Sequence, residues 1–222
     1  MRIAIDCRTI LNPGHGEDAG VGHYTSAIVK EVLRQDPENE YVLFFGARLG
    51  SSAIDELVAN HPKVKVRQFP FYDYRKALPL IHSHFLIARA IAKQRPDLLF
   101  VPTHEVPMFY QGRTVIFVHD LAILRNPDWF VQVKAERSVS AGLLLPRGIK
   151  KAAKILVPSK ATKKDLIEYF PDSRKKIVVV PHGVTRHEVT DHPLTKEMKQ
   201  RFAINGKYIL SLCTLEPRKN IA

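Results

Sequence analysis

His119 is the residue of this chain whose type and position are best suited to chemistry. It follows an apolar run and stands in the segment Val118-His119-Asp120-Leu121. At the carboxyl end of a strand, an imidazole can hydrogen-bond a substrate hydroxyl or phosphate, or move a proton near neutral pH. Asp120 can fix the orientation of this ring or cap the next element of the chain. The alternative interpretation is a histidine whose nitrogens are satisfied by backbone groups.

A glycine-rich segment near the amino terminus is the second candidate. Residues 14–24 read GHGEDAGVGHY and come between an apolar run and a helical pattern. Glycines such as Gly20 and Gly22 let the backbone approach a ligand, and the start of a helix offers free N–H groups to an anion. His23 and Tyr24 are expected to face the same cleft. The spacing is not G-x-G-x-x-G, and a flexible turn without a ligand is the alternative.

Three further loops place polar residues at the same rim of the expected sheet. His104 follows a strand expected at 97–101, and His182 ends the last strand, where Gly183 is expected to permit a sharp turn. Ser159 stands in VPSKAT, between a strand and a helix, and is a good N-cap residue that can also offer its hydroxyl to a ligand. A nucleophilic role for Ser159 is disfavoured because no G-x-S-x-G elbow surrounds it.

Other kinds of site have no signature in the sequence. No cluster of His, Cys, Asp and Glu has metal-ligand spacing, so no metal is expected, and there is no Walker-type phosphate loop. The two cysteines, Cys7 and Cys213, match neither a disulfide framework nor a zinc site. Both are expected to be buried thiols.

The elements that must position these residues alternate between short β-branched runs and longer helical patterns. Near-continuous hydrophobic strands that alternate with helices indicate a parallel sheet covered on both faces, a doubly wound, Rossmann-like α/β fold. Strands are expected at 3–6, 41–45, 64–69, 97–101, 114–118, 154–157 and 176–180. Helices are expected at 24–33, 54–59, 78–93, 131–153 with a break near Pro146, and 160–169. Helical spacing puts the apolar side of the first helix at Tyr24, Ala27, Ile28 and Val32, and that of the third at Ile81, Phe85, Ala88, Ile91 and Ala92.

The pattern changes towards the carboxyl terminus. Residues 1–184 form the expected Rossmann-like domain, and 185–206 are polar, loosely periodic and expected to be an interdomain connector with one helix. A new strand is then expected at 207–213. A strand and its loop cannot make a domain, so 207–222 are interpreted as the opening of a second, truncated one.

The charge of the chain favours anionic partners. The 222 residues carry a formal net charge of +12 at pH 7, with much of the excess between Arg147 and Lys176. A solvated basic helical face is one interpretation, and contact with a membrane surface or a phosphorylated acceptor is the other. Nucleic acid is not an expected partner because no aromatic residues are interleaved with these lysines. Without a signal peptide or a bilayer-spanning apolar run, we expect a cytoplasmic location, with peripheral attachment to the inner membrane face.

Taken together, the segments resemble retaining glycosyltransferases of family 4, which have the GT-B architecture of two facing Rossmann-like domains. Residues 20–24, GVGHY, resemble the glycine loop G-[IV]-G-R-Y of that family, and 118–121 resemble its H-D-L element. Residues 155–159 with 176–184 are similar to its "adrIlvpS…kI.VvphGV" segment. Residues 208–220 resemble "yiLsvGtlePRKN", which opens the donor domain.

The resemblance implies a transferase that moves a sugar from a nucleotide-sugar to a glycan or lipid-linked acceptor, with retention and without a bound metal or cofactor. The co-substrate would be GDP-mannose or a UDP-hexose, and mannosyl transfer in polysaccharide biosynthesis is one such activity. By resemblance, Gly20 and Gly22 would lie by the donor diphosphate, and His119 would contact the transferring sugar. Arg218 and Lys219 would stabilise the departing diphosphate.

Two positions depart from the family pattern. His23 stands where the family usually has arginine, and Cys213 replaces the usual glycine before Thr214. The nucleotide pocket of the second domain would lie outside these residues, so this half is expected to be inactive alone. The competing hypothesis is a non-catalytic Rossmann-like module that binds a phosphorylated ligand or an anionic membrane surface.

Overall fold

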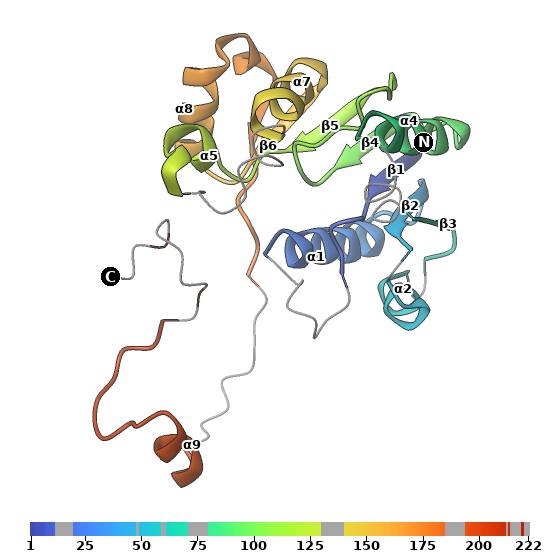
Figure 1. The fold of residues 1–222 in the computed structure, drawn as a ribbon. Helices are drawn as coiled ribbons and strands as arrows, with labels where there is room; N and C mark the ends of the chain where they lie inside the picture. The colour runs from blue at the N-terminus through green and yellow to red at the C-terminus, as the bar shows by residue number, and fades with distance from the viewer. Residues whose placement is uncertain are drawn as a thin grey trace.

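Seven parallel strands form one sheet in the order β3-β2-β1-β4-β5-β6-β7 (Figure 1). This is a computed structural model that describes residues 1–11, 20–47, 49–58, 61–70, 80–129, 140–184, 194–211, 213 and 219, with the side chains of residues 80 and 140 left aside. The strands are β1 Arg2–Asp6, β2 Glu40–Gly46, β3 Val64–Phe69, β4 Leu98–Val101, β5 Thr114–Phe117, β6 Lys154–Val157 and β7 Ile177–Val179. All seven expected strands of the first domain are therefore confirmed, and so is the doubly wound, Rossmann-like α/β class.

Helices cover both faces of the sheet. The helices are α1 Gly20–Gln35, α2 Ser51–Val58, α4 Leu80–Lys93, α5 Ala122–Arg125, α7 Leu145–Lys151, α8 Lys160–Tyr169 and α9 Lys196–Arg201. Figure 1 shows α1 and α2 on one face and α4, α7 and α8 on the other. A π-helical turn, η2 Ser140–Leu144, precedes α7, and a 3-10 turn, η3 Pro171–Lys176, precedes β7. Pro146 lies in the first turn of α7, where its missing N–H costs no helical bond, and this explains the break expected there.

Two hydrophobic cores lie on the two faces of the sheet, and successive residues of one strand feed them alternately. In β2, Leu43 joins the core beneath α1 and α2, whereas Val42 and Phe44 join the core beneath α4, α7 and α8. This alternation follows from the two-residue period of a strand and requires apolar residues at every position. It explains why the central strands appear in the sequence as unbroken apolar runs.

The rotation of two helices differs from the expected one. On α1, Ala27 was expected to face the core, but it is exposed, and Val29 and Leu33 are buried instead. On α4 the expected stripe includes Ile81 and Phe85, which are exposed, while Ser83 and His84 are buried. Both helices carry apolar or small residues over a wide arc, so the fit against the sheet, and not the count of apolar residues, fixes which side is buried.

The carboxyl-terminal part of the described chain contains one helix and no further strand. Thr195 caps α9 by accepting a hydrogen bond from the Met198 amide at 3.1 Å, as its position before the helix favours. Residues 207–211 form no strand, contrary to the prediction, because no neighbouring strand among the described residues pairs with them. The side chains of Tyr208, Ile209 and Leu210 are exposed.

The two cysteines differ in their surroundings. Cys7 is fully buried, as expected, and burial raises the pKa of its thiol well above the usual value. Cys213 is exposed, so the expectation of a buried thiol is wrong there. Burial of Cys213 would need packing partners, and the exposed segment before it supplies none.

Candidate active site at the carboxyl edge of the sheet

The strand order reverses direction between β1 and β4, and the loops at the carboxyl ends of these strands form the expected ligand crevice of a doubly wound sheet. β1 pairs with β2 on one side and with β4 on the other, so the chain winds outward in both directions from this point. In open α/β sheets, ligands bind outside the carboxyl ends of the strands at such a switch point. The residues after β1, β4 and β5 are therefore the residues that can meet a ligand.

His119 follows β5 and is fixed by the end of β4. Its Nε2 lies 2.9 Å from the Pro102 carbonyl oxygen. Since a carbonyl can only accept, Nε2 carries the proton in this contact, and Nδ1 is the nitrogen left to accept a hydrogen bond. Burial lowers the pKa of His119 below its usual value, and the neighbouring His182 and His104 act in the same direction. At neutral pH the ring is therefore neutral, with a defined tautomer.

Aromatic rings from three separate segments surround His119. The Tyr24 ring, from α1, lies edge-on to His119 at a centroid distance of 5.0 Å. The His182 ring, from the end of β7, stacks on His119 at 5.6 Å, and Phe117 of β5 lies 4.6 Å away. Tyr24 also contacts Phe117 and His182, at 4.5 and 4.9 Å. The fold thus brings together Tyr24, His119 and His182, which the sequence analysis placed in the cleft on separate grounds.

The start of α1 supplies the second feature of the site. α1 begins at Gly20, Gly22 is buried, and His23 is exposed. Residues 14–19 of the expected glycine segment lie outside the described residues, and residues 20–24 form the beginning of α1. Because Tyr24, the fifth residue of α1, contacts His119, the amino-terminal end of α1, with its positive partial charge, lies near the same rim.

The other expected rim residues have clear structural partners. Asp120 accepts a hydrogen bond from the Ala122 amide at 3.0 Å and so caps α5, which is one of the two roles expected for it. Ser159 accepts a hydrogen bond from the Thr162 amide at 3.0 Å, which confirms it as the N-cap of α8. His104 is half-buried after β4, and burial lowers its pKa. Gly183 has no left-handed backbone, so the turn expected after His182 does not depend on glycine.

A buried ion pair at the switch point was missed from the sequence. Asp6 is 5% and Arg8 9% exposed, and the Arg8 guanidinium donates to both carboxylate oxygens of Asp6, at 2.8 and 2.5 Å. Next to it, the Thr9 hydroxyl lies 2.8 Å from that of Thr25 in α1, which ties the loop after β1 to the helix. The signal available was an aspartate and an arginine directly at the end of an apolar strand, the position where polar residues serve a site.

Arg218 and Lys219 are the site residues expected from the second domain. Lys219 is exposed, and Arg218 lies outside the described residues, so their role towards a diphosphate stays a prediction.

Within the described segments, no group of three or more His, Cys, Asp or Glu residues is close enough to hold a metal ion. No helix among the described residues is both long and apolar enough to cross a bilayer. The described rim therefore offers a ligand two things: a neutral histidine that can accept a hydrogen bond, and the positive end of a helix beside it.

Several solved structures resemble the chain at low sequence identity. They include UGT2 of Phytolacca americana complexed with UDP-2-fluoro-glucose and pterostilbene, with 14% identity and a TM-score of 0.48, over 86% of this chain and 54% of that one. They also include a UGT transferase from Siraitia grosvenorii in complex with UDP (10% identity, TM-score 0.45, 82% and 50% covered). A third is UGT89C1 of Arabidopsis thaliana complexed with UDP-L-rhamnose, with 11% identity and a TM-score of 0.44, over 93% of this chain and 56% of that one.

The chain spans about half the length of these solved structures. No curated protein sequence matches it. The family model of Glycosyltransferase Family 4, in contrast, matches residues 19–188, which include α1, the His119 cluster and every strand from β2 to β7. The chain belongs to Glycosyltransferase Family 4.

Proposed function

We propose that this chain is the acceptor-side half of a GT-B glycosyltransferase that transfers a sugar from a nucleotide-sugar to a glycan or lipid-linked acceptor, with retention of configuration. The observation that carries the proposal is the contact between His119 and Tyr24, which joins a neutral histidine after β5 to the amino-terminal part of α1 at the carboxyl edge of the sheet. Membership of a glycosyltransferase family supports sugar transfer as the function of this rim.

The two parts of the rim serve different charges in such a reaction. When the bond between sugar and diphosphate breaks, negative charge grows on the diphosphate and positive charge on the sugar. The start of α1, near Gly20 and Gly22, stabilises the negative charge through its N–H groups. Nδ1 of His119, which has no hydrogen-bond partner among the described residues, accepts a hydrogen bond from a sugar hydroxyl, because Nε2 already donates to Pro102. Its neutral state avoids a second positive charge beside the developing sugar cation.

The second domain is part of the proposal. The exposed apolar side chains of Tyr208, Ile209 and Leu210 lack partners among the described residues, and a donor domain that continues from 207–222 would cover them. Residues 185–206 are then the connector, and Arg218 and Lys219 approach the leaving diphosphate from the donor side. GDP-mannose and UDP-hexoses are the donors to test first.

The decisive experiment is a donor screen with the chain joined to its donor domain. Isothermal titration with GDP-mannose and UDP-glucose identifies the donor, and NMR of the product's anomeric proton shows whether configuration is retained. His119→Ala should lower the transfer rate by about 10²-fold or more, because a positioned imidazole contributes roughly that amount. His82→Ala, which removes an exposed histidine on α4, is the matched control and should leave the rate unchanged.

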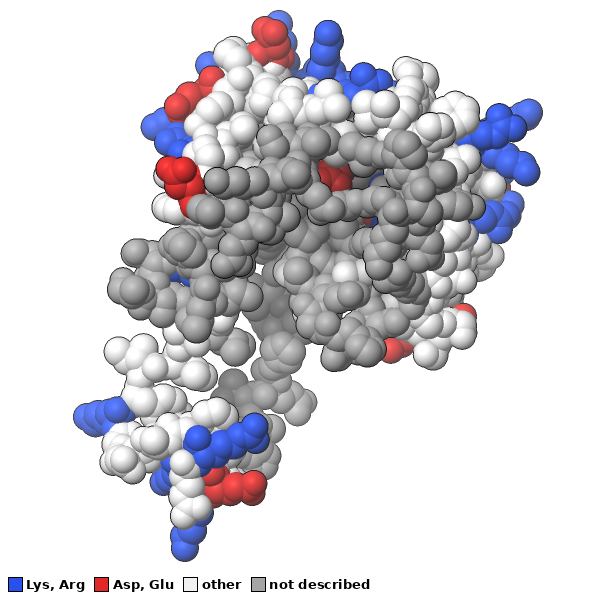
Figure 2. Space-filling model, in the orientation of Figure 1, with Lys and Arg blue, Asp and Glu red and all other residues white. Residues whose placement is uncertain are grey.

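The competing candidate, a non-catalytic module that binds a phosphorylated ligand or an anionic membrane, is favoured by the lysines and arginines between 147 and 176. Figure 2 shows blue side chains gathered at the top of the view, over the region of α7 and α8, with a few carboxylates at one flank. Failure of every donor to bind a well-folded two-domain protein would favour this candidate. Flotation with vesicles of anionic or neutral lipid tests peripheral membrane attachment, and equal recovery in both would remove it.

A further inference from the structure

A second pocket lies at the opposite edge of the sheet from His119. Its residues precede β5 and β6, so it opens at the amino ends of these strands, whereas His119 follows the carboxyl end of β5. The pocket measures about 490 Å³, within the usual range for small-molecule sites. It is lined by Gln111, Gly112, Arg113, Arg147, Lys150 and Lys151.

Four of these six residues are cations, and none is acidic. Arg113, Lys150 and Lys151 form no ion pair with the described carboxylates, although the chain carries 22 Asp and Glu residues. Arg147 is held in place because its Nε and one terminal nitrogen both donate to the Met108 carbonyl. Like charges around one pocket repel each other, and an anion bound among them would relieve the repulsion.

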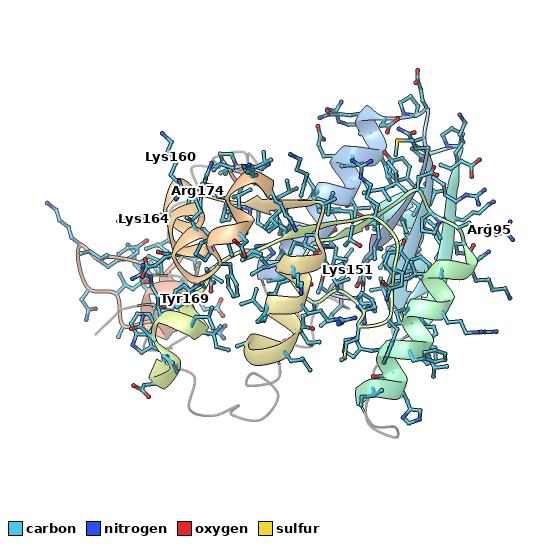
Figure 3. All side chains as sticks on the ribbon, turned by 90° about the horizontal axis from the view of Figure 1, so that it is seen from above. Arg95, Lys151, Lys160, Lys164, Tyr169 and Arg174 are labelled. Atoms are coloured by element: carbon cyan, nitrogen blue, oxygen red, sulfur yellow. The ribbon has the colours of Figure 1, made fainter. Side chains whose placement is uncertain are left out.

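Lys151 distinguishes this pocket from a solvated basic surface. Its Nζ is buried and has no hydrogen-bond partner among the described residues, and it lies 5.6 Å from the centre of the Tyr110 ring. In Figure 3 Lys151 lies beside α7 near the middle of the view, whereas Lys160 extends from α8 into open space. A buried ammonium without a partner is costly, and contact with one ring face compensates only part of that cost. Burial, together with the nearby Arg147, lowers the pKa of Lys151.

The carboxyl end of α7 would by itself oppose an anion, because free carbonyls give a helix end negative partial charge. In this structure two of those carbonyls, of Gly148 and Lys150, accept hydrogen bonds. Lys176 Nζ donates to the Lys150 carbonyl at 2.8 Å, and the Ala152 amide donates to the Gly148 carbonyl at 2.9 Å. Lys176 therefore brings a fifth positive charge to the end of α7 and offsets part of the negative partial charge there.

We propose that this pocket binds the phosphate of a phosphorylated small molecule or lipid headgroup, at a site separate from the transferase cleft. A phosphomonoester carries about two negative charges and three strong acceptor oxygens, so it suits four cations better than a single carboxylate does. The guanidinium group of Arg113 can donate to two phosphate oxygens, Arg147 can donate through the N–H groups that Met108 does not use, and Lys151 supplies a point charge at the inner wall. A pocket of this size also holds the organic group that bears the phosphate.

The test is isothermal titration of the chain with inorganic phosphate and with glycerol 3-phosphate, at constant ionic strength set by chloride. Lys151→Met should weaken phosphate binding by about tenfold or more, since it removes a charge-assisted contact in a buried position. Lys164→Met, at an exposed lysine on α8, should change it less than about twofold, as expected for an exposed charge outside the pocket. Equal binding by Lys151→Met and the parent chain, or no phosphate binding at all, would overturn the proposal.

Two further arms complete the experiment. Flotation with phosphatidylcholine vesicles, with and without phosphatidate, distinguishes a lipid headgroup from a soluble phosphorylated ligand. A lipid headgroup is identified if the chain binds only the vesicles with phosphatidate and Lys151→Met abolishes this binding. A soluble ligand is identified if the chain binds glycerol 3-phosphate but not these vesicles. If Lys151→Met unfolds in circular dichroism, Arg113→Gln at the same pocket replaces it. Donor binding at the His119 cleft is measured separately, so failure of one proposal does not carry over to the other.

Discussion

The rings of His119 and His182 are stacked, with centroids 5.6 Å apart and planes inclined by 23°. The two histidines follow different strands, β5 and β7, and the charge of His182 is one of the causes that lower the pKa of His119. A positive charge on His182 disfavours a second one on His119, and the His182 ring also covers His119 from water. This pair, together with Tyr24, keeps the histidine at the cleft neutral.

Replacement of His182 should therefore raise the pKa of His119. His182→Gln removes both the charge and part of the cover, and both changes favour the protonated form of His119. NMR titration of the His119 ring protons measures the effect directly, with the pKa moving up towards about 6.5, the value of a free histidine. An unchanged or lower pKa would show that His182 has no part in setting the pKa of His119, which would then depend on burial and on the hydrogen bond to Pro102 alone.

Stability should fall as the solution becomes acidic. Burial lowers the pKa values of both His104 and His119 in the folded chain, whereas both return to about 6.5 on unfolding. Below that pH the unfolded chain binds more protons, so the free energy of unfolding decreases as pH falls from about 7 to about 5 and is fully retained above that window. Urea unfolding across this range measures the slope. His119→Gln should make the slope shallower, and a slope that is the same in the variant would contradict the assignment.

The Asp6–Arg8 pair should be the most sensitive charged pair of the described chain. Arg8→Leu leaves the buried Asp6 carboxylate without its partner and should cost about 3–5 kcal/mol in the free energy of unfolding. The double variant Asp6→Asn with Arg8→Leu should recover part of this loss, since no unpaired charge remains. Urea unfolding of the single and double variants gives both values.

A control exists for this experiment at the surface. Arg34 pairs with Glu31 on the exposed side of α1 through a bond of similar length, 2.6 Å. Arg34→Leu should have little effect on stability, because water screens an exposed pair. Similar losses for Arg8→Leu and Arg34→Leu would mean that burial does not set the strength of the Asp6–Arg8 pair.

Gly148 should tolerate no side chain. A methyl group there would overlap with the His104 carbonyl oxygen, so α7 and the loop after β4 would have to separate. We expect Gly148→Ala to lower the free energy of unfolding by about 1–3 kcal/mol, the usual cost of overpacking. Gly142→Ala is the matched control, since nothing lies within 4 Å of a methyl group at that position. It should be neutral or stabilising by up to about 1 kcal/mol through the unfolded chain. Thermal unfolding of both variants decides the matter.

The order of strands and helices could be predicted from the sequence, because apolar residues recur with a different spacing in each kind of element. β3, β6 and α8 begin and end at the residues that the pattern predicts, since apolar strands alternate with helices and Ser159 is a strong N-cap signal. The carboxyl-edge positions of His104, His119 and His182 followed from the same logic, because parallel strands bring their ends to one rim. Resemblance to a transferase family rested on short segments in the right order, and the family model confirms the family.

Only the tertiary structure decided which of these residues meet. The faces of α1 and α4 depend on the fit of whole helices against the sheet, so the burial of Val29 and His84 could not be inferred from spacing alone. The strand expected at 207–213 shows the same limit, because a β-strand needs hydrogen bonds from a neighbour, and local sequence cannot supply one. The stacked rings of His119 and His182 come from distant parts of the chain, so only the folded structure brings them together. The Asp6–Arg8 pair and the amine of Lys151 are special because they are buried, and burial is decided by packing.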